Sequence, residues 1–251
     1  MSCSAMGEVE VEVWAEGIGV LTLNAPERRN ALTPGLVSDI VAAADWLESQ
    51  REVRVVVVTG AGSAFCAGAA LSHLESADSS ALRGIYDAFL RVQSIKVPTI
   101  AAVNGPAVGA GLNLAMACDL RVVSDEAVFD SRFLRLGLHP GGGASWLLRR
   151  TAGEELTSAM LLFGLRVKGS DCVARGLAWD CVPTSDLLQT ARRMAKQAAD
   201  APSELSALTK QSLRETWGLS HGDTLEVELE RQAWTATQPW FALSRTPERG
   251  N

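Results

Sequence analysis

The stretch Thr99-Ile100-Ala101-Ala102-Val103-Asn104-Gly105-Pro106-Ala107-Val108-Gly109-Ala110-Gly111 sets the expected architecture of the chain. Its first five residues are small or β-branched and lead directly into Asn104-Gly105-Pro106, which predicts a strand over 99–103 that ends in a turn. A run without polar alternation is typical of a parallel strand covered on both faces. Gly111 then opens a short, very apolar segment that we expect to be a helix over 111–118. The stretch therefore predicts one strand–turn–helix unit of an α/β fold.

Similar patterns extend toward the N-terminus. Residues 53–58 are largely β-branched and end at Thr59-Gly60, which predicts a second buried strand. Glu and Val alternate over 8–13, and a further strand is expected over 20–23, so these two runs predict a hairpin. Between the hairpin and 53–58, Thr33-Pro34 carries the residue types that begin a helix.

The second half of the chain is different, because helical patterns dominate from about Trp146 onward. The expected helices cover 156–163, 170–175, 185–199, 203–217 and 224–235. There is no internal repeat and no low-complexity linker. We therefore expect one α/β core, residues 1–184, followed by a helical C-terminal region, residues 185–251.

Composition narrows the classes of partner. The chain has 251 residues, of which 47% are hydrophobic and 21% charged, as in a globular domain with a substantial core. The net charge of −6 and a pI near 5.2 argue against nucleic acid or an anionic membrane as the main partner. An anionic ligand would need local positive charge.

The cysteines favour a reducing compartment. There are five, Cys3, Cys66, Cys118, Cys172 and Cys181, without a C-x-x-C pair, which argues against a disulfide framework and against a zinc site. The N-terminus lacks the basic and apolar regions of a secretory leader. No apolar run reaches the ~20 residues that span a bilayer. We therefore expect a soluble, cytoplasmic protein that holds no metal.

Two runs of small residues follow the buried strands, at 65–70 and at 106–111. The second begins like a dinucleotide-binding fingerprint, but the third glycine of G-x-G-x-x-G would fall at Leu114. Ligands of open α/β sheets bind at the carboxyl ends of strands, and small residues leave backbone N–H groups free to face a ligand. Two such groups that converge on one carbonyl oxygen form an oxyanion hole. The alternative is that both runs are turns that merely permit tight packing.

Four motifs, in order along the chain, resemble a known family. Residues 24–32 resemble N-x-P-x-x-x-N-A-L, residues 65–69 resemble F-x-A-G-A, and residues 104–119 resemble N-G-x-x-x-G-G-G-x-E-L-A-x-x-C-D. Residues 137–143 resemble L-G-x-x-P-G-x-G. In combination the chain resembles the crotonase (enoyl-CoA hydratase/isomerase) superfamily over roughly residues 8–235.

The resemblance implies a fold, an assembly and a ligand. The fold would be the crotonase-like stack of ββα units (the ClpP/crotonase fold), with a helical C-terminal trimerisation region and a homotrimer or a hexamer of two trimers. The ligand would be an acyl-CoA thioester, with no separate cofactor. The backbone N–H groups of Ala69 and Ala110 would form the oxyanion hole. Coenzyme A would lie along Arg28, Arg29, Ala31, Ala67, Gly68, Ala69, Ala70, Leu71, Ser72, Gly109 and Ala110.

The chain departs from the family pattern where acid–base chemistry is expected. Hydratases of this family use two glutamates, one to activate water and one to deliver a proton. The resemblance maps these positions to Asn113 and Phe133, and neither side chain exchanges protons near neutral pH. The Asp that usually follows the first oxyanion donor is replaced by Ala70. Ordinary hydration by two glutamates is therefore not expected.

Two residues are candidates to replace the missing groups. His139 stands in Leu138-His139-Pro140-Gly141, and an imidazole changes its protonation state near neutral pH. The alternative for His139 is a loop residue that caps a backbone carbonyl. Asp130 is a weaker candidate, because it is expected to form a structural ion pair with Arg132 or Arg135.

Three functions stay open on the sequence. The chain is either an atypical enzyme of the hydratase/isomerase superfamily, which we favour, or a non-catalytic acyl-CoA-binding protein. The third possibility is another enolate reaction, or hydrolysis of the thioester, that uses His139. The missing glutamates favour binding alone, whereas the retained oxyanion segments favour catalysis.

Overall fold

The computed structural model describes residues 2–70 and 78–244. Within them a seven-stranded sheet has the order β1-β2-β3-β4-β5-β7-β10. Its strands are β1 (Ser2–Met6), β2 (Val9–Trp14), β3 (Ile18–Leu23), β4 (Val55–Gly60), β5 (Thr99–Val103), β7 (Leu120–Ser124) and β10 (Asp180–Val182). The first three are antiparallel, and from β3 onward neighbouring strands are parallel.

A second, three-stranded sheet joins β6 (Pro106–Val108), β8 (Val128–Asp130) and β9 (Val167–Lys168). The small-residue run at 106–111 therefore begins as the short strand β6, which the sequence did not predict. The predicted strand over 53–58 is shifted to Val55–Gly60, because Thr59 and Gly60 still pair with Thr22 and Leu23 of β3.

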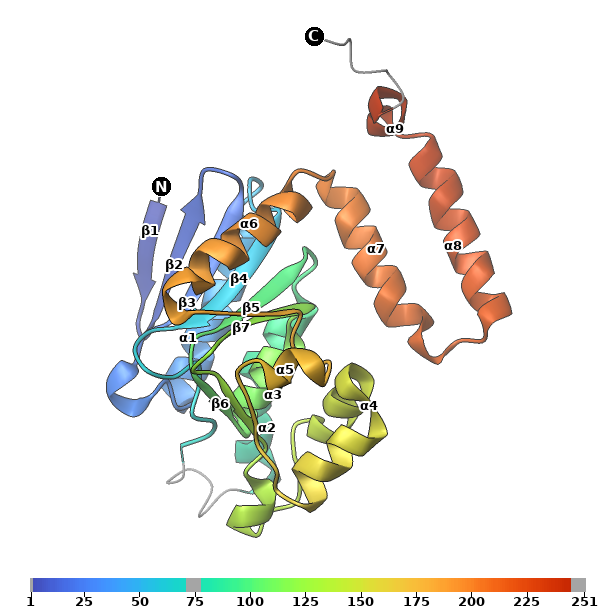
Figure 1. Ribbon diagram of the computed structural model, residues 1–251. Coiled ribbons are helices and arrows are strands. Elements are labelled where there is room, and N and C mark those ends of the chain that lie inside the picture. Colours follow the sequence, from blue (N-terminus) through green and yellow to red (C-terminus); the bar gives the residue numbers. More distant parts are fainter. Residues whose placement is uncertain (1, 71–77, 245–251) are drawn as a thin grey trace.

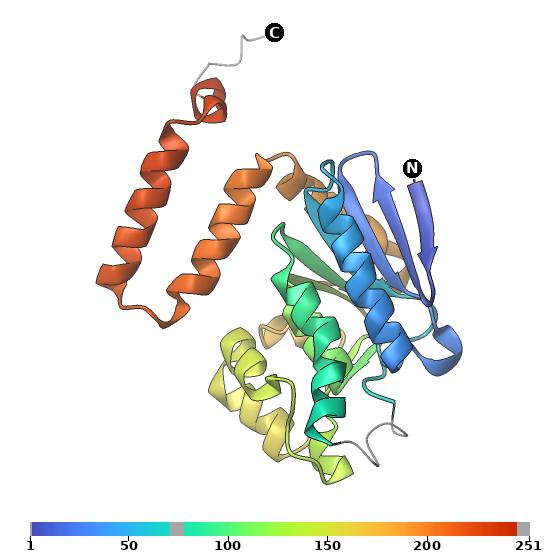
Figure 2. The same ribbon diagram turned by 180° about the vertical axis from the view of Figure 1, so that it is seen from behind.

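Helices cover both faces of the large sheet. Those before the middle of the chain are α1 (Pro34–Ser49), α2 (Ser79–Ser94) and α3 (Ala110–Ala117). They are followed by α4 (Ala144–Leu162), α5 (Asp171–Ala174), α6 (Leu187–Ala199), α7 (Ser203–Glu215), α8 (His221–Ala236) and α9 (Pro239–Ser244). Figure 1 shows α6 in front of the sheet, and Figure 2 shows α1 and α2 on the opposite face.

Strand β4 explains why both faces are covered. Val56 and Val58 point into the main core with α1 and α2, whereas Val55 and Val57 point into a smaller core with α6. Alternate residues of a strand face opposite sides, so a run of valines is buried only between two helical layers. The prediction of a doubly covered parallel strand is confirmed, since every residue of β4 is buried.

The start of α1 also follows the expectation. The Thr33 hydroxyl accepts a hydrogen bond from the N–H of Leu36 at 3.1 Å, and Pro34 is the first helical residue. This cap satisfies one of the N–H groups that a helix leaves without an internal partner.

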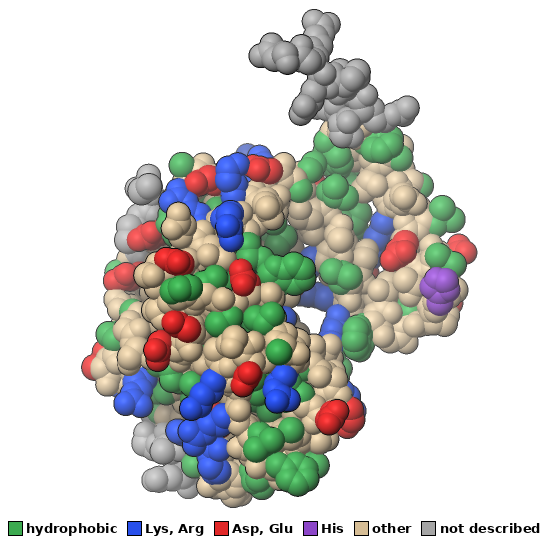
Figure 3. Space-filling model, in the orientation of Figure 1, with side chains coloured by type: hydrophobic (Ala, Val, Ile, Leu, Met, Phe, Trp, Pro, Cys, Tyr) green, Lys and Arg blue, Asp and Glu red, His purple; other side chains and the backbone are tan. Residues whose placement is uncertain are grey.

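The C-terminal helices α7 and α8 extend away from the body as an antiparallel pair (Figure 1). Helix α8 has no buried residue, and its Leu225, Leu229 and Trp234 are 51%, 60% and 45% exposed. The space-filling view is open between α7 and the body (Figure 3). In contrast, α6, which also belongs to the predicted region 185–251, packs on the large sheet. A division of the chain at residue 184 therefore stays a prediction.

Of the helices that the structure describes, none is both long enough and apolar enough to cross a membrane.

Candidate functional site

The two small-residue segments lie against each other where β4 and β5 end. Cys66 pairs with Ala107 as an isolated parallel bridge, and its N–H and C=O bond to the backbone of β6 at 3.1 and 2.9 Å. Gly68 has a φ of +92°, and a methyl group added to it would lie 2.5 Å from the Val108 carbonyl oxygen. Only a glycine permits this close approach. The sequence segments 65–70 and 106–111 thus form one site at the carboxyl ends of adjacent parallel strands.

Among the described residues, the backbone N–H groups of Ala69 and Ala110 at this junction have no hydrogen-bond partner. Those of the flanking residues Ala70 and Gly109 donate to backbone carbonyls at 3.1 and 2.9 Å. No hydrogen bond within residues 2–70 and 78–244 uses the N–H of Ala69 or of Ala110. Ala110 is the first residue of α3, so its N–H carries the positive end of the helix dipole. Both groups are available to a carbonyl oxygen of a ligand.

A cavity of about 150 Å³ adjoins these residues. Ala69 and Ala110 line it together with Tyr86 of α2 and Val108 of β6. No Asp or Glu is present among the described residues that line it. Its wall is therefore largely apolar, with a few polar groups that are able to orient a ligand.

Asn113 lies one turn into α3 and lines the cavity, although it is only 2% exposed. Its Nδ2 donates to the carbonyls of Gly141 and Gly142 at 3.0 and 3.4 Å. Its Oδ1 is the one buried side-chain nitrogen or oxygen in the described part of the chain that has no hydrogen-bond partner. An amide oriented in this way accepts a hydrogen bond but takes up no proton.

Phe133 and His139 reach the same cavity from the loop that follows β8. Phe133 begins the short 3₁₀-helix η3 (Phe133–Leu136) and packs against the main core. The Nδ1 of the exposed His139 lies 2.8 Å from the carbonyl oxygen of Pro140. A carbonyl only accepts, so this contact places the proton of the neutral ring on Nδ1 and leaves the lone pair of Nε2 free. The contact with the Pro140 carbonyl agrees with the interpretation of His139 as a loop residue that caps a backbone carbonyl, and its role in acid–base chemistry stays a prediction.

Asp130 at the end of β8 is 3% exposed and does not line the cavity. Its carboxylate pairs with Arg135, and Arg166 and Arg132 follow at 3.4 and 4.0 Å. The predicted structural ion pair is confirmed. A carboxylate held in this way is not in position to act on a ligand in the cavity.

The residues predicted to contact coenzyme A fall in two places. Ala67, Gly68, Ala69, Gly109 and Ala110 line the cavity. Arg28 and Arg29 precede Ala31 on the neighbouring loop, which is tied to the site because Ala67 N–H donates to the Arg29 carbonyl at 2.9 Å. The Arg28 guanidinium pairs with Glu8 at 2.5 Å and with Glu27 at 2.8 Å. Leu71 and Ser72 lie outside the described residues.

The sequence did not identify the contribution of α2, whose Leu82, Ile85 and Tyr86 also line the cavity. Their i, i+3, i+4 spacing was visible as an apolar stripe, but a stripe alone does not tell a cavity wall from a core.

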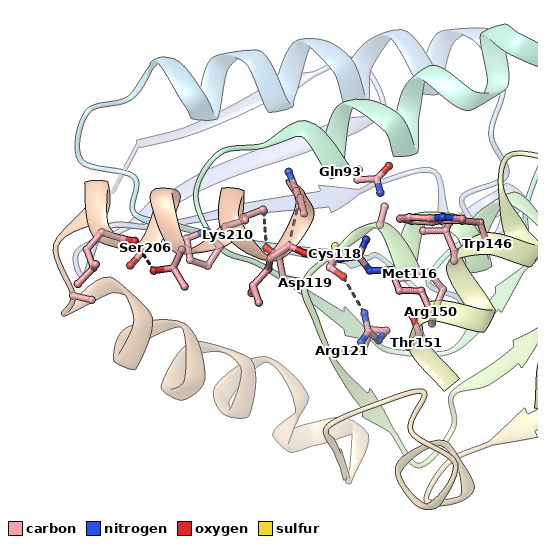
Figure 4. A pocket seen from close by; sticks show the side chains of 18 residues that line it. Gln93, Met116, Cys118, Asp119, Arg121, Trp146, Arg150, Thr151, Ser206 and Lys210 are labelled. Carbon is pink, nitrogen blue, oxygen red and sulfur yellow. Dashed lines mark hydrogen bonds and ion pairs between the residues drawn. The ribbon is translucent and has the colours of Figure 1, made fainter. Parts of the chain in front are cut away.

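A larger cavity of about 680 Å³, which the sequence did not predict either, lies at the other end of α3, below α7. It is lined by Arg121, Arg150, Lys210 and Arg214 and by one carboxylate, Asp119. Figure 4 shows Lys210 of α7 directed at Asp119, and the two side chains are 2.5 Å apart. Burial lowers the pKa of Lys210, and the Asp119 carboxylate opposes that effect.

Arg150 in the same cavity is stacked between two aromatic rings. Its guanidinium lies 5.0 Å from the centre of the Trp146 ring and 4.2 Å from that of Trp217. Burial, followed by the charge of Arg214, lowers the pKa of Arg150. Among the described residues that line this cavity, four side chains are thus positively charged and only that of Asp119 is negatively charged.

The chain resembles known proteins over most of its length. Residues 14–239 match the family described as Enoyl-CoA hydratase/isomerase. A Mycobacterium tuberculosis protein described as "Probable enoyl-CoA hydratase EchA14" is 43% identical over 236 residues, which cover 90% of this chain and 91% of that protein. A Rhodobacter capsulatus protein described as "Probable enoyl-CoA hydratase" is 35% identical over 224 residues, with 86% and 84% covered. The crystal structure of an enoyl-CoA hydratase from Polaromonas sp. JS666 superposes with a TM-score of 0.86 at 31% identity, over 92% of this chain and 93% of that one.

The chain therefore belongs to the enoyl-CoA hydratase/isomerase family. The predicted crotonase-like fold is confirmed, and the C-terminal region is helical as expected. Within the described residues no three His, Cys, Asp or Glu side chains form a group that could hold a metal ion. The absence of a metal from the function stays a prediction.

Proposed function

We propose that the protein binds an acyl-CoA thioester with the thioester carbonyl oxygen between the N–H groups of Ala69 and Ala110. The observation that carries this proposal is that both donors are unpaired and line one cavity. Membership of the enoyl-CoA hydratase/isomerase family supports a CoA thioester as the ligand. The loop with Arg28, Arg29 and Ala31, tied to Ala67, would then take the nucleotide end.

The chemistry that these two donors favour is formation of an enolate. When a proton leaves the α-carbon, negative charge develops on the thioester oxygen, and two fixed N–H groups stabilise it in the transition state. His139 lines the cavity, and its Nε2 is the candidate base among the described residues. We propose that it takes the α-proton, while Asn113 orients a polar group of the ligand through its unpartnered Oδ1.

A specific observation favours a second candidate, a non-catalytic acyl-CoA-binding protein. No carboxylate among the described residues lines the cavity, so the two-glutamate hydration of the family has no proton donor or acceptor of the usual kind here. The two candidates share the ligand and differ in whether His139 exchanges a proton with it.

One experiment tests the proposal and separates the two candidates. The protein is mixed with butyryl-CoA in D2O, and exchange of the α-protons is followed by mass spectrometry while affinity is measured by calorimetry. Ala110→Pro removes one N–H at the first helical position, where proline is well accommodated, and Ala110→Gly is the control that keeps the N–H. Loss of one oxyanion donor should slow exchange by roughly 10²–10³-fold.

The outcomes are distinct. Binding without exchange by the wild-type protein would identify a binding protein, and His139→Gln should abolish exchange in an enzyme without weakening affinity. Unchanged affinity and exchange in Ala110→Pro, with circular dichroism that matches Ala110→Gly, would refute the oxyanion assignment.

We also propose that the chain assembles as a homotrimer or as a hexamer of two trimers through residues 185–251. The exposed apolar side chains of α8 support this, because isolated domains seldom expose such a series. The larger cavity below α7, with its unbalanced positive charge, would be filled by a neighbouring subunit.

A further inference from the structure

Three guanidinium groups share one carboxylate beside the candidate site. Arg135 contacts Asp130 most closely, because its Nη2 donates to both oxygens of the carboxylate. Arg166 lies 3.4 Å away and Arg132 4.0 Å away, and no second carboxylate pairs with either of them within the described residues. One negative charge is thus set against three positive charges. Arg132 is the most distant of the three from the Asp130 carboxylate, so its positive charge is the least neutralised.

The backbone of Arg132 is held in an unusual conformation. Its φ of 57° lies in the left-handed region, which side chains with a Cβ seldom adopt. The Arg132 N–H donates to Asp130 Oδ1 at 2.9 Å, and this bond fixes the conformation. Such strain costs ~1–2 kcal/mol and persists where the surroundings determine it, often at functional sites. The Asp130 carboxylate therefore accepts a hydrogen bond from the backbone of Arg132 and forms its closest ion pair with Arg135.

Among the described residues, the guanidinium of Arg132 at the cavity therefore has no carboxylate closer than that of Asp130, at 4.0 Å. Arg132 is the one Arg or Lys among the described residues that line the cavity, and its side chain is 45% exposed. A planar guanidinium binds carboxylate or phosphate through paired hydrogen bonds. The site is therefore suited to an anionic group.

We propose that Arg132 binds a carboxylate on the acyl group, so that the ligands of this protein are CoA thioesters of dicarboxylic acids. This inference rests on the proposed acyl-CoA function. A phosphate of coenzyme A is the alternative source of the anion. The cavity of about 150 Å³ is smaller than the ~300–1,000 Å³ of sites that enclose drug-sized ligands, so a short acyl group fits it better than a nucleotide.

The test compares matched pairs of ligands that differ in one carboxylate. Affinities are measured by calorimetry for malonyl-, succinyl- and glutaryl-CoA, for propionyl-, butyryl- and pentanoyl-CoA, and for free CoA. At least one dicarboxylic thioester should bind roughly 10- to 100-fold more tightly than its neutral partner, the range expected of a charge-assisted hydrogen bond. Arg132→Gln should remove this preference and leave the affinity for neutral thioesters and free CoA unchanged.

Arg166→Gln is the matched control, since Arg166 also approaches Asp130 but does not line the cavity. It should keep the preference, and circular dichroism should show both variants folded. Equal affinity within every pair would overturn the inference, and so would an Arg132→Gln variant that loses affinity for free CoA and all thioesters alike. The second result would assign Arg132 to a phosphate. Failure to bind any acyl-CoA would instead overturn the proposed function itself.

Discussion

Hydration of crotonyl-CoA by this protein should be very slow, and carboxylates introduced at residues 113 and 133 should restore it in part. Addition of water to the β-carbon requires one group that takes a proton and one that gives a proton. Loss of general acid–base help costs ~10²–10⁴-fold per group. Against a median turnover of ~10 s⁻¹, two missing groups predict a rate below roughly 10⁻³ s⁻¹.

The structure limits how far Asn113→Glu with Phe133→Glu restores the rate. The amide of Asn113 donates to the carbonyls of Gly141 and Gly142, and a carboxylate there would face those oxygens without a proton. Loss of these donors should cost ~1–3 kcal/mol of stability and should raise the pKa of the new carboxyl group. Phe133 packs against the core, so a shorter charged side chain also leaves space behind it. We expect a gain of roughly 10–10²-fold over the wild-type protein.

The assay is the loss of enoyl-CoA absorbance, confirmed by mass spectrometry of the product. Asn113→Gln with Phe133→Leu is the control, because it changes both side chains without adding a carboxylate. A wild-type turnover of ~10 s⁻¹ or more would refute the reasoning and would point to His139 as a complete acid–base system. A folded double Glu variant no faster than its control would show that residues 113 and 133 do not face the reacting carbons.

Three further outcomes are expected. Light scattering at micromolar concentration should give a trimer or hexamer, and Leu229→Glu, at a position 60% exposed on α8, should shift it toward the monomer; a wild-type monomer would refute the assembly. Burial raises the pKa of Cys66 to about 12, so in the native protein at pH 8 this thiol should resist alkylation in peptide mapping, whereas the less buried Cys181 should react faster than Cys66. Asp119→Asn should lower the free energy of unfolding in urea by about 3 kcal/mol, because it leaves the buried Lys210 without its carboxylate, and a change below ~1 kcal/mol would contradict the pairing.

Local sequence patterns predicted the elements that depend on local chemistry. The valine run of β4 and the Thr33 cap of α1 formed as expected, because burial on both faces and a hydroxyl before a proline carry their own signal. The short strands β8 and β9 gave no such signal. Two or three residues become a strand only when the rest of the fold brings a partner beside them.

The same limit applies to the candidate site. The small-residue segments located it, but the unpaired state of Ala69 N–H and Ala110 N–H follows from where all neighbouring amides bond. The left-handed backbone of Arg132 has no glycine to indicate it. Lys210 contacts Val97, which is 113 residues away in the chain, so its burial is a property of the tertiary structure.

The tight contact between the two small-residue segments determines which residues of this site tolerate substitution and which do not. A methyl group on Gly111 would lie 2.2 Å from the Cys66 carbonyl oxygen, and one on Gly68 would be nearly as close to Val108. The donors themselves belong to the main chain, so no substitution except proline deletes them. Mutation can therefore exchange the side chains at residues 113, 132, 133 and 139 while the two proposed main-chain donors stay in place. Such a fold can change its reaction, or lose catalysis and still bind its ligand, through substitutions that leave it folded at every step.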